Sequence, residues 1–473
     1  MKRNSLQPWH LLPAGQSIRL AKFYTLLAAA SSFALLTACD SGADEAISPS
    51  AELGQTTSSQ QARGMTGINV LLKGPVTDAA LNELKKYGTV VKVIPEINAL
   101  SMRVAGDQLS TIQGLSFVDI ANPDAERKGA PADAVSVADF SNGISTWNLD
   151  AVNVTDMGEG FMMQQDATGV YVGVLDTGLL DSWRQYFPEQ RIATQYAKAF
   201  GGGGGEVGNV SEQPNKWEHD QNSHGTHVTS TIIGFNLRGT AISGVAPKAT
   251  IIPVKVLNQN GSGWSSVVAQ GIVHIANLKA GPLKDSPVVI NMSLGGPVLD
   301  AVEKAAVDYA IEKGVIIVAS AGNSGMAGMG YPGAYAPVIS VASAGLVAAG
   351  TIPAWWYALD IAEPTNPSDF YLASYSSRAK PGQDLDVTAP GSSIVGPYQL
   401  NSGQLSYYYL SGTSMASPHV AGIVALMVEK NPALNASQVE NVLETVAIPM
   451  PGLTASEVGH GFITADAALG VVQ

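Results

Sequence analysis

The chain has 473 residues, of which 45% are hydrophobic and 14% charged, so it can form a large folded core and is not a disordered protein. Its formal net charge of −13 argues against nucleic-acid binding, because phosphate backbones attract clustered Lys and Arg. The single cysteine excludes an internal disulfide bond.

The N-terminal stretch has the pattern of an export signal. Basic residues precede an apolar run over 23–36, and Leu36-Thr-Ala-Cys39 follows at once. The run is shorter than the ~20 residues that a bilayer-spanning helix needs, which favours a removed signal over a permanent anchor. We interpret 1–38 as a lipoprotein signal peptide and Cys39 as the lipidation site of a bacterial protein, anchored to the cell envelope or secreted after release. An ordinary signal with an incidental cysteine is the alternative.

Residues 39–65 are rich in Ser, Ala, Gly, Thr and Gln without an apolar period, which is typical of a flexible linker. A compact pattern follows. It predicts strands over 67–73, 89–94, 99–104 and 117–120, and helices over 78–87 and 107–113. The resulting order β-α-β-β-α-β is the ferredoxin-like α+β pattern.

From about residue 145, buried strands alternate with helices. Val- and Ile-rich runs lie at 170–175, 250–256, 288–292, 315–319 and 338–342, and helices are predicted at 267–278 and 301–312. Continuous apolar strands of this length indicate a parallel sheet that is covered on both faces. The predicted fold class is therefore α/β, a three-layer α/β/α sandwich with a mainly parallel sheet.

Three polar residues stand at the ends of these elements. Asp176 ends an apolar strand, His224 opens a predicted helix, and Ser414 begins another, which Thr413 is expected to cap. A serine hydroxyl becomes a good nucleophile when a base takes its proton and an acid holds that base in place. The segment around Ser414 could alone be a capped helix start. Together with Asp176 and His224 it predicts an acid, a base and a nucleophile.

These three segments, in the order Asp, His, Ser, resemble the signature blocks of the subtilisin-like serine peptidases. A fourth block, Gly314 to Ser324, carries Asn323, and the resemblance implies that this side chain donates to the oxyanion. It implies a serine endopeptidase that acts on polypeptides and requires no cofactor for its chemistry. The rival interpretation is a catalytically idle surface lipoprotein that uses the fold for binding. The complete set of catalytic residues argues against that rival.

The resemblance also implies a domain organisation. Residues 66–128 resemble the family's inhibitory, fold-assisting propeptide, whose tail would lie in the substrate cleft and be cut by the enzyme itself between 122 and 137. Residues 129–473 would form the subtilisin-like catalytic domain. A permanent accessory domain is the alternative for the smaller unit.

The same resemblance places substrate recognition on two segments that sandwich an extended peptide as an added strand. Their residues are Gly261, Ser262, Gly263, Ser293, Leu294, Gly295 and Gly296. Gly295, Gly296, Ala321 and Gly330 would line an uncharged, roomy pocket for the P1 residue, the one before the scissile bond, so we expect large apolar residues there. For Ser293 to Gly296 a plain strand-ending turn is the alternative.

Metal binding and two insertions are less defined. The loop 235–241 follows the His block, where many subtilases hold structural Ca²⁺, but it offers no carboxylate, so no particular ligands are predicted. The insertion 201–205 is a run of five glycines. The aromatic-rich insertion 348–372 could dock a partner or pack on its own domain.

Overall fold

The computed structural model describes residues 64–136, 146–156, 160–201, 213–351, 360–399 and 406–473. The signal peptide 1–38, Cys39 and nearly all of the linker 39–65 lie outside the described residues, as do most of the glycine run 201–205 and the aromatic residues 355–357. No helix among those described has the length and apolarity needed to cross a membrane.

The small unit that follows has the predicted order of elements. These are β1 (Met65–Leu72), α1 (Asp78–Leu84), β2 (Gly88–Ile94), β3 (Ala99–Ala105), α2 (Gln108–Gln113) and β4 (Val118–Pro123). Its four strands form an antiparallel sheet in the order β2-β3-β1-β4, with a core of its own that includes Val70, Leu100 and Met102. Helix α1 ends three residues before the predicted end, because the chain tightens there into i to i+3 hydrogen bonds at Lys86 and Tyr87.

The large unit is built on an eight-stranded sheet. Along the sheet the strands are β10 (Lys198–Ala199), β13 (Thr250–Lys255), β9 (Tyr171–Asp176), β15 (Val288–Met292), β16 (Val315–Ser320), β17 (Ile339–Leu346) and β18 (Phe370–Leu372), with β19 (Val387–Pro390) beside β17. All neighbours are parallel except β17 and β18. The five predicted strands are thus confirmed as β9, β13, β15, β16 and β17.

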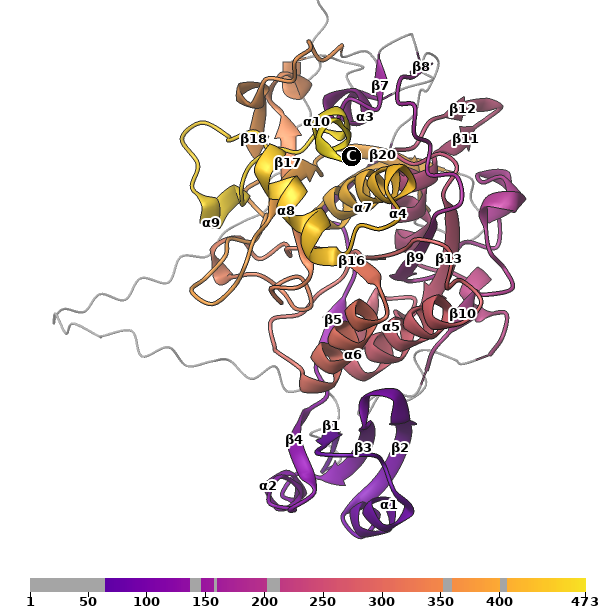
Figure 1. The fold of residues 1–473 in the computed structure, drawn as a ribbon, viewed down its shortest axis with the longest axis vertical. Coiled ribbons are helices and arrows are strands. Elements are labelled where there is room, and N and C mark those ends of the chain that lie inside the picture. The colour runs from indigo at the N-terminus through magenta and orange to yellow at the C-terminus, as the bar shows by residue number, and fades with distance from the viewer. Residues whose placement is uncertain (1–63, 137–145, 157–159, 202–212, 352–359, 400–405) are drawn as a thin grey trace, which may run out of the picture. The chain divides into compact units, whose positions relative to one another are not determined.

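Helices cover both faces of this sheet (Figure 1). On one face lie α4 (His224–Ile233), α7 (Thr413–Lys430), α8 (Ala436–Val446) and α10 (Ala465–Val471), and on the other α5 (Ser265–Ala280) and α6 (Ala301–Glu312). Strand β16 shows why both faces are apolar, because Ile316 and Val318 join the first cluster while Ile317 and Ala319 join the second. The predicted three-layer α/β/α sandwich is confirmed.

Shorter elements surround the sheet. They are β5 (Glu126–Lys128), β6 (Asp133–Ser136), α3 (Trp147–Ala151), β7 (Thr155–Asp156), β8 (Gly160–Phe161), β11 (Phe235–Leu237), β12 (Thr240–Ile242), β14 (Ser262–Trp264), β20 (Ile394–Pro397), β21 (Tyr407–Ser411) and α9 (Ala455–Val458).

The described part of the aromatic insertion packs on its own domain. Phe370 is 5% exposed and stacks on Phe462, with ring centroids 4.3 Å apart, and on Trp147 at 6.4 Å. Tyr371, by contrast, remains 46% exposed. Of the two alternatives for this insertion, packing on the domain holds for Phe370.

Candidate active site

The structure joins Asp176 and His224 in a buried pair. Asp176 is the last residue of β9, and Ser223, with a φ of 77°, turns the chain so that His224 begins α4. The His224 Nδ1 lies 2.8 Å and 3.0 Å from the two carboxylate oxygens of Asp176, and both side chains are fully buried. This contact holds the imidazole with Nδ1 as the donor and turns Nε2 away from the acid.

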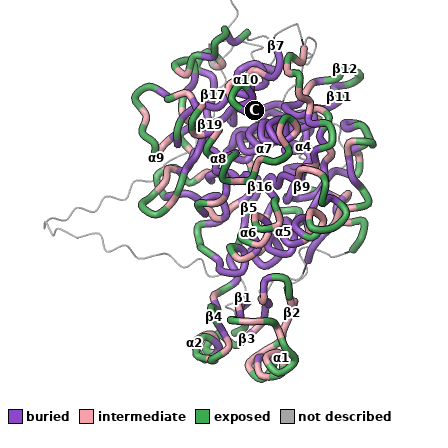
Figure 2. The backbone as a smooth tube through the Cα atoms, in the orientation of Figure 1, coloured by how far each residue is buried: buried purple, intermediate pink, exposed green. Residues whose placement is uncertain are grey.

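Ser414 is the second residue of α7, at the N-terminus of a long helix whose first sixteen residues are buried (Figure 2). Its Oγ donates to the Ser293 carbonyl at 3.1 Å, and the Ser293 Oγ donates back to the Ser414 carbonyl at 2.7 Å. Among the described residues, His224 Nε2 has no hydrogen-bond partner. The hydroxyl of Ser414 is therefore directed at Ser293 and not at the imidazole.

The expectation that Thr413 caps α7 is wrong. The capping position is Gly412, and Thr413 is the first helical residue. The Thr413 Oγ1 instead accepts from the Gly322 N–H and donates to Asn323 Oδ1. A cap requires non-helical backbone, and the chain reaches helical geometry one residue earlier than predicted.

The hydrogen bonds of Thr413 orient the Asn323 side chain. Its Oδ1 accepts from the Thr413 N–H and from Thr413 Oγ1, both at 2.9 Å, so a backbone donor identifies this atom as the oxygen. The Nδ2 points the other way and donates to the Ala130 carbonyl at 3.4 Å. Such a distance to a ground-state carbonyl is long, and an oxyanion donor needs its short contact only in the transition state.

The residues after β4 run as an extended strand between two segments of the large unit. On one side β5 pairs antiparallel with β14, so that Lys128 lies opposite Ser262. On the other side Lys128 exchanges two backbone hydrogen bonds with Gly295, at 3.0 Å and 2.9 Å. Beyond Ala130 the chain continues as β6, which pairs with β21. The two predicted recognition segments thus flank a peptide strand, and this strand is the chain's own.

The four residues expected around the P1 residue lie together. Gly296 and Tyr331 exchange backbone hydrogen bonds at 3.0 Å and 2.8 Å, and the Gly330 N–H donates to the Ala321 carbonyl at 2.9 Å. A Cβ on Gly296 would lie 2.2 Å from the Glu126 carbonyl, so only glycine lets the tail approach this closely.

The junction of the small unit with the large one is polar and buried. The Asn69 Nδ2 donates to Asp124 at 3.0 Å and to Asp300 at 2.9 Å, while Asp124 accepts from the Ser266 N–H at the start of α5. Asp300 caps α6 by accepting from the N–H groups of Val302 and Glu303. Burial, and then the neighbouring charge of Asp300, raises the pKa of Asp124.

Sequence reasoning missed a buried ion pair between β5 and α6. The Arg127 Nε and Nη2 donate to the two carboxylate oxygens of Glu303 at 2.8 Å and 2.7 Å, and neither side chain is exposed. The available signal was a carboxylate in the first turn of an otherwise apolar helix face. It indicates a helix N-terminus as readily as a site.

Two histidines of the signature blocks are held by local hydrogen bonds. His227 Nε2 faces the Ile394 carbonyl at 3.0 Å, and His419 lies between the Met415 carbonyl and Asn148 Nδ2, each at 2.8 Å. Burial lowers the pKa of His227 to about 3 and that of His419 to about 4, so both stay neutral near pH 7.

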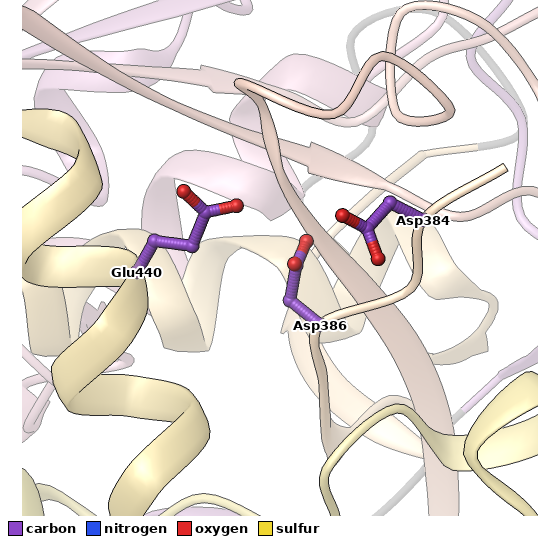
Figure 3. A group of neighbouring side chains, drawn as sticks. All are labelled: Asp384, Asp386 and Glu440. Carbon is purple, nitrogen blue, oxygen red and sulfur yellow. The ribbon is translucent and has the colours of Figure 1, made fainter.

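The loop 235–241 forms the hairpin β11–β12. The Asn236 Oδ1 accepts from the Gly239 N–H at 2.7 Å and so closes the turn. A cluster that the sequence did not predict lies elsewhere. Asp384 and Asp386 come from one chain segment, and Glu440 faces them from α8, with carboxylate oxygens within 4.8 Å of one another (Figure 3).

The mainly parallel sheet is covered by helices on both faces, a buried Asp–His pair lies at the end of β9, and Ser414 stands at the N-terminus of α7. These are the features expected of a serine hydrolase with an α/β fold. The model of the subtilase family matches residues 167–465, and the chain belongs to this family. It is a subtilisin-like serine protease, and the chemistry of this family requires no cofactor.

Three similar proteins illustrate the relationship. Subtilisin DY of Bacillus licheniformis is 36% identical over 303 residues, which cover 63% of this chain and 90% of that protein. Subtilisin Savinase of Lederbergia lenta is 34% identical over 301 residues, covering 64% and 91%. Among solved structures, fervidolysin of Fervidobacterium pennivorans, described as a keratinolytic enzyme related to subtilisin, has a TM-score of 0.63 at 24% identity over 86% of this chain and 61% of that one. At that identity the last comparison concerns the fold alone.

Proposed function

We propose that this protease is an endopeptidase made as a self-processing zymogen, with Asp176, His224 and Ser414 as its catalytic triad and Asn323 as its oxyanion donor. The observation that carries the proposal is the chain's own strand in the cleft, with the Ala130 carbonyl against Asn323 Nδ2. The segment 124–130 lies between the two recognition segments as a substrate would, and this supports an inhibitory role for 66–128.

The proposed reaction uses these groups in order. Ser414 Oγ attacks the carbonyl carbon while His224 Nε2 takes its proton, and Asp176 stabilises the imidazolium that forms. Asn323 Nδ2 stabilises the oxyanion. When the C–N bond breaks, His224 returns the proton to the departing nitrogen, and water then hydrolyses the acyl-enzyme by the same route. The Ser414 hydroxyl must first turn from the Ser293 carbonyl towards Nε2, which has no hydrogen-bond partner among the described residues.

The strand register favours one bond for the proposed self-cleavage. Lys128 pairs with Gly295, the Gly129 N–H donates to Gly261, and the Ala130 carbonyl faces Asn323. We therefore propose cleavage between Ala130 and Pro131, two residues beyond the boundary 128/129 drawn from sequence and inside the expected stretch 122–137.

N-terminal sequencing and intact mass of the purified mature protein test this proposal. The expected N-terminus is Pro131, or a residue close after it if trimming follows. A mature protein that keeps residues 66–128 covalently attached would contradict the propeptide assignment and favour a permanent accessory domain.

For external substrates we propose a preference for large apolar P1 residues, because Gly295, Gly296, Ala321 and Gly330 bring neither charge nor a long side chain. Peptides that differ only in Phe, Ala or Glu at this position should be cleaved in that order of kcat/KM. A faster cleavage after Glu would contradict the assignment of the pocket.

For localisation we propose export through the signal 1–38 and lipid anchoring at Cys39. Stable anchoring takes more than one acyl chain, as bacterial lipoproteins carry. Cys39→Ser should move the protein from the membrane fraction to the soluble fraction. A wild-type protein found only in the soluble fraction would refute the anchor without touching the peptidase assignment.

A further inference from the structure

The fourth residue before the proposed scissile bond is Arg127, and its side chain enters a closed acidic subsite of the enzyme. Two parallel hydrogen bonds join it to Glu303, and Nη1 donates to the Glu126 carbonyl at 3.1 Å. The Gly296 backbone lies against the guanidinium, since a Cβ there would be 3.0 Å from Nη1. The planar fork of arginine matches a carboxylate in this geometry, which a point charge cannot do.

The electrostatics of the subsite favour a cation. Burial raises the pKa of the Glu303 carboxyl, and the charge of Arg127 opposes that rise. The charge of Asp300, which belongs to the catalytic unit, adds to the need for a positive partner, and the Tyr335 hydroxyl donates to the Asp300 carbonyl at 2.8 Å, not to Glu303. A peptide with an apolar residue here would leave a buried carboxylate without a partner.

A simpler role for Glu303, as an acid at the start of a helix, is already filled. Asp300 caps α6, and its Oδ1 accepts from the Glu303 N–H at 3.1 Å and from the Val302 N–H at 2.9 Å. The Glu303 side chain is thus not needed to cap the helix and is available to bind Arg127. It also belongs to the catalytic unit and remains there when the tail leaves.

We propose that Glu303 makes this protease select polypeptides with arginine at P4, four residues on the N-terminal side of the cleavage point. The proposal rests on the proposed function, since it takes the tail as a substrate-like strand. The residue two before the bond, Gly129, lies close to the enzyme, since a Cβ on it would be 2.6 Å from Leu257 Cδ1, the end of a side chain that can shift. The substrate class is therefore extended chain with Arg at P4.

The test uses mature wild-type enzyme and internally quenched peptides. Each peptide carries the sequence of 125–130 with alanine in place of Pro131, and the position of Arg127 is Arg, Lys, Gln, Met or Glu. Mass spectrometry identifies the bond cut. We expect kcat/KM for Arg to exceed that for Met by about 10- to 100-fold, with Lys between them and Glu lowest, since pairing a buried charge is a large effect. Equal kcat/KM for Arg and Met would overturn the proposal.

The variant Glu303→Leu should lose the preference and cleave the Met peptide faster than the Arg peptide. Glu312→Gln is the matched control, because Glu312 lies on the same helix, is 72% exposed and should leave selectivity unchanged. If Glu303→Leu does not fold, the wild-type peptide series still decides. If neither these peptides nor an unfolded protein is cut by the wild type, the proposed function itself fails, and the selectivity proposal fails with it.

The full chain gives a second test. Arg127→Met and Glu303→Leu should each slow maturation by about tenfold, and the double variant should recover most of that loss because both charges are gone. Additive losses in the double variant would mean that the two residues act independently and would overturn the proposal.

Discussion

The two ends of the cleft differ in how tightly they hold the same strand. At Arg127 the contact is bidentate, short and closed to solvent. At the proposed reaction centre, three residues on at Ala130, Ser414 Oγ is directed at Ser293 and the contact of Asn323 with the Ala130 carbonyl is 3.4 Å long. The contacts that hold the strand most tightly are therefore remote from the proposed scissile bond. Binding energy from remote contacts can position a peptide bond while the catalytic groups keep their short contacts for the transition state.

Removing the nucleophile should abolish cleavage while leaving the contacts of Arg127 with the tail intact. Ser414→Ala should lower turnover on the order of 10⁶-fold and accumulate as a precursor that still carries residues 66–130, with the tail held in place by Arg127. Mass spectrometry of protein from a host without other extracellular peptidases checks this. His224→Ala should behave alike, and Asp176→Asn should mature slowly. Mature mass from Ser414→Ala would assign the cut to another enzyme.

Weakening the oxyanion contact should affect the chemical step alone. Asn323→Leu is expected to lower kcat by about 100- to 1000-fold with KM nearly unchanged, since its Nδ2 makes a short contact only in the transition state. Steady-state kinetics on one peptide measure both constants. The variant also removes the two contacts with Thr413, so unchanged thermal stability is the necessary control. An effect confined to KM would place Asn323 among the binding residues.

The Ala130–Pro131 bond, because it precedes a proline, should slow self-cleavage. The nitrogen that His224 must protonate is that of Pro131, where it is part of a ring that also restricts the backbone. Pro131→Ala should speed maturation several-fold, as followed by the disappearance of precursor with time. Ala132→Ser is the control, because the nitrogen of residue 132 belongs to the next peptide bond. An unchanged rate, with cleavage at another bond, would show that Ala130–Pro131 is not the scissile bond.

The smallest expected effect lies away from the proposed active site, at the carboxylates Asp384, Asp386 and Glu440. Burial raises the pKa of Asp386 to about 7, with Asp384 and Glu444 adding to the rise, and burial together with Asp386 raises the pKa of Glu440 to about 7. Because these folded-state values lie above the ordinary values near 4, the native state binds more protons, and stability falls as pH rises through about 7.

Glu440→Gln should flatten this dependence and raise Tm at pH 8 by about 2–4 °C, measured in buffer with a chelator. Asp308→Asn on the exposed surface of α6 is the control. A wild-type Tm that rises from pH 6 to pH 8 would show that the carboxylates find a compensating charge. Added Ca²⁺ that raises Tm in the wild type but not in Glu440→Gln would identify that charge as a bound cation.

Local sequence patterns predict five strands of the large sheet and the three candidate catalytic residues. The Val- and Ile-rich runs predict β9, β13, β15, β16 and β17 because such strands are buried on both faces, and Asp176, His224 and Ser414 stand in local segments that carry their own turns. The order of elements in the small unit is predicted by the periodicity of its apolar residues.

Features that depend on contacts between distant parts of the chain could not be predicted from local patterns. Arg127 and Glu303 are 176 positions apart, and nothing local marks either as the partner of the other. The register that sets Ala130 against Asn323 comes from strand pairing, which has no local sequence signal when the partners are glycine-rich. The position of Thr413 inside α7 depends on Asn323 in the same way, because hydrogen bonds between side chains from different elements form only once the layers are packed.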